Sequence, residues 1–123
     1  MHTHLAETTA TTLASLDFVD VTDEVAAALV ESRIKNGHVT VFASGRDCSL
    51  ILNERESGLW HDLKTALAPQ DELPADRRAV LGSSSVVMPA VEGRLHLGRW
   101  QRVLLVELGE PSERTLSVQI VGE

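Results

Sequence analysis

Four consecutive apolar residues, Val103-Leu104-Leu105-Val106, place apolar side chains on both faces of the strand that they would form. Side chains of a strand alternate between its two faces, so this run predicts a strand that is covered on both sides. Such a strand needs neighbouring strands and apolar material above and below it. The chain has 123 residues, 43% of them hydrophobic, which suits one domain of ordinary size. We therefore expect a single domain, residues 1–123, around a central strand at 100–108.

Further strands and two helices follow from the periodicity of the remaining sequence. Period-two alternation predicts strands at 4–11, 15–21, 38–43, 48–53, 85–97 (a hairpin that turns at 92–93) and 114–121, with 38–43 paired to 48–53. One helix is expected to begin at Thr22 as its N-cap and to end at Asn36-Gly37. A second begins at a capping pair of Asn53 and Glu56 and ends at Pro69. Without a regular βαβ rhythm, the fold class is α+β, with two main helices on a mixed β-sheet.

The charge of the chain limits the classes of partner that it is expected to bind. The formal net charge is −7 and no run of Lys or Arg occurs, which argues against nucleic acid and against an anionic membrane surface. No apolar stretch approaches the roughly 20 residues of a membrane span. The single cysteine, Cys48, excludes an intrachain disulfide, and residues 1–7 do not resemble a signal peptide. We expect a cytoplasmic protein in which Cys48 is a buried, inert thiol.

The order of several motifs resembles the YjbQ family of thiamine-phosphate-synthase-like proteins. The matching segments are 18–25, Leu52-Asn53-Glu54, the block from Gly93-Arg94-Leu95 through Leu97-Gly98-Arg99-Trp100-Gln101, and Val121-Gly122-Glu123. The resemblance covers about residues 17–123, and the block at 93–101 is its most specific part. It implies a compact α+β subunit that assembles as a homotrimer with pockets between subunits. Some relatives have a secondary ability to make thiamine phosphate from a pyrimidine diphosphate and a thiazole phosphate.

The chain departs from this family at its histidines. The positions where relatives carry imidazoles correspond to Gly45, to Asp76 and to a shortened loop at 68–73 that has no histidine. Imidazole is the usual general base at neutral pH because its pKa lies near 6.5. The resemblance therefore implies that the family's His-based reaction is lost in this chain.

Other residues around the same implied site offer two alternative chemistries. Arg46 can hold a phosphate or carboxylate in bidentate fashion, with Ser83 and Ser84 opposite it in the family layout, or can simply pair with Asp47. Asp47 and Asp76 can share a proton or hold a divalent cation, or can be solvated residues. Three further candidate ligand-binding residues come from the matching motifs: Asn53, Glu54 and Gln101. For Gln101 and Trp100, the alternative is an architectural role at a subunit boundary, with Gln101 bonded to the backbone.

Three hypotheses follow from these residues. The first is a divergent family member of unknown physiological role that has lost the His-based activity and binds a small phosphate or carboxylate ligand in an inter-subunit pocket. The second is an enzyme with a rebuilt Asp-based site, assisted by a divalent cation, that acts on a phosphorylated small molecule. The third is a divergent chain without a ligand. The five histidines do not pair at ligand spacing, so no metal site and no resident cofactor is predicted.

Overall fold

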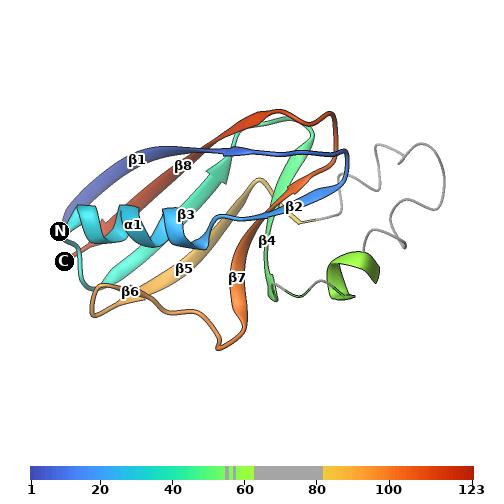
Figure 1. The fold of residues 1–123 in the computed structure, drawn as a ribbon. Coiled ribbons are helices and arrows are strands. Elements are labelled where there is room, and N and C mark those ends of the chain that lie inside the picture. The colour runs from blue at the N-terminus through green and yellow to red at the C-terminus, as the bar shows by residue number, and fades with distance from the viewer. Residues whose placement is uncertain (55, 57, 63–81) are drawn as a thin grey trace.

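A computed structural model describes residues 1–54, 56, 58–62 and 82–123. The elements are β1 (His2–Thr11), β2 (Asp17–Asp20), α1 (Thr22–Ser32), β3 (Gly37–Ala43), β4 (Cys48–Glu54), β5 (Ser85–Val91), β6 (Arg94–Leu95), β7 (Gln101–Glu107) and β8 (Glu113–Gly122). Residues 58–62 add one short helical segment. The ribbon has a long sheet with α1 along one face and a smaller sheet at the other end of the molecule (Figure 1).

The strands form two antiparallel sheets. One has five strands in the order β1-β8-β3-β5-β6, and the other has three in the order β2-β7-β4. The α+β class is confirmed. The described ladders refine the expected mixed sheet, because each of them is antiparallel.

The pairing predicted between 38–43 and 48–53 is wrong. β3 pairs with β8 and β5 in the large sheet, whereas β4 pairs with β7 in the small one. The polar connection at 44–47 carries the chain from one sheet to the other. Alternation shows which face of a strand is buried, and it does not show which strand lies beside it.

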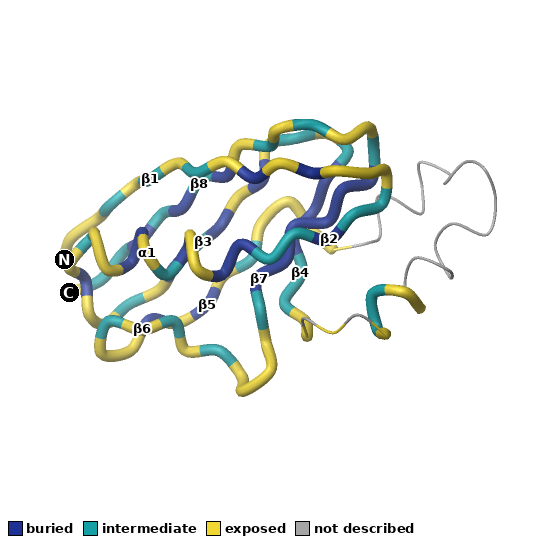
Figure 2. The backbone as a smooth tube through the Cα atoms, viewed as in Figure 1, coloured by how far each residue is buried: buried dark blue, intermediate teal, exposed yellow. Residues whose placement is uncertain are grey.

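The core lies between the inner face of the large sheet, α1 and the small sheet. α1 contributes Val25 and Leu29 to the same buried cluster as Val39 of β3, Val118 of β8 and Leu105 of β7. Buried positions run along the strands that face this core (Figure 2). The apolar residues of β8 at 116, 118 and 120 are buried, as their alternation predicted.

β7 is the central strand of the small sheet, which confirms the expectation for 100–108. Its residues 103–106 are completely buried. Val103 and Leu105 belong to the main core, and Val106 belongs to a second cluster with Phe18 and Leu108 on the other face. Apolar packing on both sides thus explains the unbroken apolar run.

The helix ends differ from the predicted ones. α1 begins at Thr22 itself, after Val21, and its backbone is tied to the side chain of Asp20, whose Oδ1 accepts hydrogen bonds from the Thr22 amide (3.0 Å) and hydroxyl (2.7 Å). Thr22 is therefore not the cap, because its Oγ1 accepts from the amide of Val103 across the core. The helix stops before Asn36-Gly37 because Arg33 takes a left-handed conformation (φ 64°).

The start of the second helix also differs. The carboxylate of Glu56 accepts hydrogen bonds from the amides of Gly58 (2.8 Å) and Leu59 (2.6 Å), so Glu56 caps the segment 58–62. Asn53 lies within β4, and its side-chain oxygen accepts from the adjacent amide of Glu54. The rest of this predicted helix, with its end at Pro69, lies outside the described residues.

Candidate functional site

The candidate residues divide between the two ends of the β4–β7 ladder. This ladder runs for seven residues, from Cys48 opposite Glu107 to Glu54 opposite Gln101. At roughly 3.3 Å per residue, its ends are about 20 Å apart. The predicted residues Asn53, Glu54 and Gln101 lie at one end, and Arg46 and Asp47 lie just beyond the other. Within one subunit they do not form a single site.

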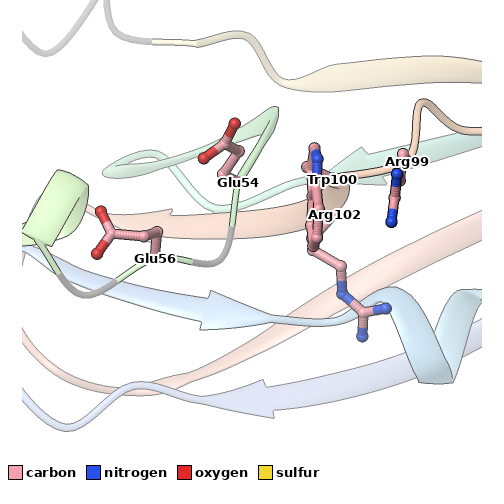
Figure 3. A pocket seen from close by; sticks show the side chains of 5 residues that line it. All are labelled: Glu54, Glu56, Arg99, Trp100 and Arg102. Atoms are coloured by element: carbon pink, nitrogen blue, oxygen red, sulfur yellow. The ribbon is translucent and has the colours of Figure 1, made fainter.

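A cleft of about 580 Å³ opens at the Glu54 end. The described residues that line it are Glu54, Glu56, Arg99, Trp100 and Arg102 (Figure 3). The sequence had pointed to Glu54 as a ligand-binding residue, and it had missed both arginines. Their signal was present in the sequence, because they flank Trp100-Gln101 in its most specific motif.

A tight turn presents Trp100 and Arg99 to the cleft. The amide of Gln101 donates to the carbonyl of Gly98 (3.0 Å), and the Gln101 side-chain oxygen accepts from the Gly98 amide (2.7 Å). The Gln101 side chain is thus bonded to the backbone, as the architectural alternative expected. The Trp100 side chain remains 65% exposed, and the Arg99 guanidinium lies 5.0 Å from the centre of its ring, a cation–π distance.

Arg102 connects the cleft to α1. Its Nε donates to Asp20 (2.8 Å) and its Nη2 lies 3.3 Å from Asp23. The hydrogen bond to Asp20 raises the pKa of Arg102. Burial by itself raises the pKa of Asp20, but the hydrogen bonds from Thr22 and Arg102 outweigh it and lower the pKa below the usual value. Both groups therefore stay charged at neutral pH.

The other charged groups of the cleft differ in how far they are already paired. The amides of Gly58 and Leu59 lower the pKa of Glu56 and occupy its carboxylate. Neither the Glu54 carboxylate nor the Arg99 guanidinium has a hydrogen bond or an ion pair within the described part of the chain. Figure 3 shows Glu54 on one side of Trp100 and Arg99 on the other. The cleft thus offers an open carboxylate, an open guanidinium and an exposed aromatic ring.

The opposite end of the ladder holds a buried ion pair. Glu107 is completely buried, and Arg114 donates to both of its oxygens, from Nε (2.9 Å) and from Nη2 (2.6 Å). The Thr12 hydroxyl (2.7 Å) and the Gly109 amide (3.0 Å) also donate to it. We call these four residues the Glu107 cluster. Burial by itself raises the pKa of Glu107, but these donors outweigh it and lower the pKa.

Gly45 and Cys48 lie against the Glu107 cluster. A Cβ atom on Gly45 would lie 2.7 Å from the Cys48 sulfur and 2.9 Å from Nη1 of Arg114. Cys48 is buried, as expected, and burial raises the pKa of its thiol. The space that a side chain at position 45 would need is therefore filled by its neighbours.

Three of the remaining candidates, Arg46, Ser83 and Ser84, lie near this second end. Arg46 is exposed and forms no ion pair within the described ranges, with Asp47 or with any other residue. Ser84 accepts through its carbonyl from the Ala43 amide (2.8 Å), and Ser83 pairs in the same way with Leu50, so both lie beside β3 and β4. Asp76 lies outside the described residues, which contain no group of three or more His, Cys, Asp or Glu side chains that could hold a metal.

The fold and the cleft define a small antiparallel α+β domain with a charged cleft where β4 and β7 end. The chain belongs to the YjbQ-like family of UPF0047 proteins, whose family model matches residues 6–123. It is 34% identical to a UPF0047 protein of Archaeoglobus fulgidus, over 92% of this chain and 98% of that protein. It is 29% identical to one of Methanothermobacter thermautotrophicus, over 88% and 85% of the two chains.

Solved structures agree with this assignment. A YbjQ-like protein of unknown function from Sulfolobus solfataricus superposes with a TM-score of 0.87, at 32% identity over 99% of each chain. A hypothetical protein from Aeropyrum pernix gives 0.83, at 30% identity over 98% of this chain and 99% of the other. Among the described residues, no helix is long and apolar enough to cross a membrane.

Proposed function

We propose that this chain is a divergent UPF0047 protein that binds a small organic anion, a phosphate or a carboxylate, and has lost the His-based thiamine-phosphate-synthase-like reaction. The observation that carries the proposal is Arg99, an arginine without a carboxylate partner in the described part of the chain that lines a cleft of about 580 Å³. A guanidinium binds the oxygens of a phosphate or carboxylate through two parallel hydrogen bonds. Trp100 beside it offers an aromatic surface for the rest of the ligand.

The two carboxylates of the cleft restrict the kind of anion. Glu56 is bonded to two backbone amides, which reduces its repulsion of a ligand. Glu54 has no such partner in the described residues, so it favours a ligand that carries a hydrogen-bond donor as well as an anionic group. A ligand with an acidic group at Arg99 and a donor at Glu54 satisfies both sides of the cleft.

Two features support the loss of the inherited reaction. No histidine is among the described residues that line the cleft. Gly45, which stands where relatives carry one, cannot take a side chain without displacing Cys48 or Arg114. Because a general base must lie within hydrogen-bond reach of its proton, this geometry offers no imidazole for that step.

The proposal includes a cytoplasmic homotrimer whose cleft lies near a subunit boundary. The exposed ring of Trp100, on a turn fixed by Gln101, supports it, because large aromatic side chains on rigid turns are common at interfaces. The alternative enzyme, with Asp47, Asp76 and a divalent cation acting on a phosphorylated small molecule, is distinguished by the same experiment.

Thermal unfolding with inorganic phosphate, pyrophosphate and citrate, at matched ionic strength and with and without Mg²⁺, tests the proposal. A ligand at 100 times its dissociation constant stabilises the folded state by about 2.7 kcal/mol. We expect a rise in Tm that Arg99→Ala abolishes and that Arg46→Ala, the matched change at the other end of the ladder, leaves unchanged. A rise that depends on Mg²⁺ and on Asp47 supports the enzyme instead.

Two outcomes overturn the proposal. If Arg46→Ala removes the shift and Arg99→Ala does not, the anion binds at the other end of the β4–β7 ladder. If the chain supports growth of a strain that lacks thiamine-phosphate synthase, the inherited reaction has survived.

A further inference from the structure

Arg102 has hydrogen-bond donors that the described part of the chain leaves unused. A guanidinium carries five N–H donors: one on Nε and two on each terminal nitrogen. Nε donates to Asp20 at 2.8 Å and Nη2 donates to Asp23 at 3.3 Å. Among the described residues, no group accepts from Nη1 or from the second hydrogen of Nη2. Three of the five donors are therefore open to a ligand.

The two aspartates that hold Arg102 do so unequally. The Asp20 side chain is 10% exposed, and the amide and hydroxyl of Thr22 also donate to it, so its position is fixed. The Asp23 side chain is 89% exposed and its contact with Arg102 is longer. Exposed pairs of this kind are weak and are screened by salt. Asp20 therefore fixes the guanidinium, whereas Asp23 is a partner that another anion can replace.

Arg102 lies at the boundary between two cavities. It lines the cleft of about 580 Å³ together with Arg99, and it also lines a second cavity of about 340 Å³ beside the first turn of α1. Among the described residues, it is the only one that lines both. Its guanidinium reaches from β7 toward α1 (Figure 3). A ligand in the cleft therefore contacts a side chain that Asp20 already holds in place.

Arg99 and Arg102 are close enough for one small molecule to reach both. Their Cα atoms are at most about 11 Å apart, because three residues of extended chain span no more than that. Both side chains line the same cleft. Arg99 lies against the ring of Trp100 and has no ion pair within the described part of the chain. A ligand with a single acidic group satisfies only one of these two guanidinium groups.

The charge of the cleft favours carboxylates over phosphates as the acidic groups. The two guanidinium groups share the cleft with Glu54 and Glu56, and the chain as a whole has a net charge of −7. A phosphate monoester carries about −1.5 to −2 at neutral pH, so two of them bring about three to four negative charges. Two carboxylates bring two, which equals the charge of the two arginines.

We infer that the ligand of the cleft is a dicarboxylic acid, with one carboxylate bound by Arg99 and the other by Arg102. The inference rests on the proposed function and names the class of ligand within it. The second carboxylate bonds to Nη1 of Arg102 and replaces Asp23 at Nη2, while Asp20 keeps Nε. Each arginine then holds one carboxylate through two parallel hydrogen bonds. Arg102 is the residue that distinguishes a diacid from a monoacid.

Calorimetric titration with 2-hydroxyglutarate and 2-hydroxypentanoate tests the inference. The two acids share a five-carbon chain and a hydroxyl donor for Glu54, and they differ by one carboxylate. Because hydrogen bonds to charged groups contribute about tenfold or more to a binding constant, we expect the wild type to bind the diacid at least tenfold more tightly. Arg102→Lys keeps a cation beside Asp20 but loses the fork of donors, and it should reduce this ratio to about two. Arg46→Lys is the matched control and should keep the wild-type ratio.

Asp23→Ala gives a second readout that leaves both arginines in place. It removes the internal competitor for Nη2 of Arg102, so the affinity for 2-hydroxyglutarate should rise about threefold and that for 2-hydroxypentanoate should stay the same. Glu24→Ala is the matched control. It removes the same charge from the same turn of α1, and Glu24 has no ion pair with Arg102 among the described residues. We expect it to leave both affinities unchanged.

The outcomes separate this inference from the proposed function. If neither acid nor any phosphate binds to the wild type, or if Arg99→Ala leaves their binding intact, the proposed function fails and the inference fails with it. The inference alone fails if binding depends on Arg99 but the two acids bind equally well, or if Arg102→Lys keeps the wild-type ratio. It also fails if pyrophosphate binds more tightly than 2-hydroxyglutarate, or if Glu24→Ala raises the affinity for the diacid as much as Asp23→Ala does.

Discussion

The two ends of β7 both carry an ion pair between an arginine and a carboxylate, but the pairs differ in what surrounds them. At the end of the strand, Glu107 is completely buried and accepts four hydrogen bonds from Arg114, Thr12 and Gly109. Near its start, Arg102 is shared between Asp20, which is mostly buried, and Asp23, whose side chain is 89% exposed.

The end of the ladder at Glu107 stabilises the fold, whereas the end at Arg102 is open to a ligand. A buried carboxylate with every oxygen paired has no capacity left for a ligand, and removing one of its partners leaves a charge without water. The pair at Arg102 is reached by solvent, so a bound anion can compete with Asp23 there. The cleft at this end is therefore the better place to look for function.

The largest effect is expected from removing the arginine of the Glu107 cluster. Arg114→Met leaves the Glu107 carboxylate buried without its cation, and breaking a buried pair in this way costs about 3–5 kcal/mol. Urea unfolding measures the loss. The matched control is Arg46→Met, because Arg46 is exposed, and its effect should remain within about 0.5 kcal/mol. Equal losses in the two variants would show that the cluster does not stabilise the fold.

A smaller loss is expected at Gly45, which packs against the same cluster. In Gly45→Ala the new methyl group lies 2.7 Å from the Cys48 sulfur and 2.9 Å from Arg114 Nη1; the guanidinium is held by Glu107 and the Cys48 side chain is buried. Overpacking of this kind typically costs about 1–3 kcal/mol. Ser44→Ala, one residue earlier and exposed, should be nearly neutral.

The double variant Gly45→Ala/Cys48→Ala identifies the cause. Removing the sulfur opens the space that the methyl group needs, so the two changes together should cost less than their sum. Additive losses in urea unfolding would mean that the Cys48 contact is not responsible for the effect of Gly45→Ala.

The strands and helices differ in how well the sequence predicted them. The bounds of β7 and β8 were predicted within one or two residues. Burial on one face produces alternating apolar residues and burial on both faces produces an unbroken apolar run, and both patterns can be recognised in a sequence. The pairing partners of β3 and β4 were predicted wrongly. Alternation shows which face of a strand is buried, and it is the same whichever strand lies beside it. The helix ends were shifted by Asp20 and Arg33, whose effects come from a side-chain bond and a left-handed backbone.

The candidate site shows a similar division. Glu54 and Gln101 were found because they lie in matching motifs, and the structure puts them opposite each other across β4 and β7. The Glu107 cluster was missed entirely. Its members Thr12 and Glu107 are 95 residues apart, and a single acidic residue after an apolar run carries no sign that it is buried. Contacts of this range depend on the tertiary fold.

Acid should weaken the Glu107 cluster. The folded-state pKa of Glu107 is depressed, so its contribution is present above the ordinary pKa of about 4.3 and is lost as pH falls through the folded value. Glu107→Gln keeps the shape of the side chain but does not titrate. The stability advantage of the wild type over this variant should therefore shrink as pH is lowered, as measured by urea unfolding from pH 7 downward. An advantage that is constant with pH would mean that the charge of Glu107 is not what stabilises the cluster.

The smallest effect is expected at the exposed end, from Asp23→Asn. Exposed ion pairs contribute about 0–1 kcal/mol and are screened by salt, so the variant should lose less than Asp20→Ala, which also removes the hydrogen bonds to Thr22. Urea unfolding at low and high salt measures both, and only the small loss at Asp23 should vanish at high salt. If Asp23→Asn instead costs as much as Asp20→Ala, Asp23 holds Arg102 as firmly as Asp20 does. The guanidinium would then be a fixed part of the fold and not a group that a ligand in the cleft can recruit.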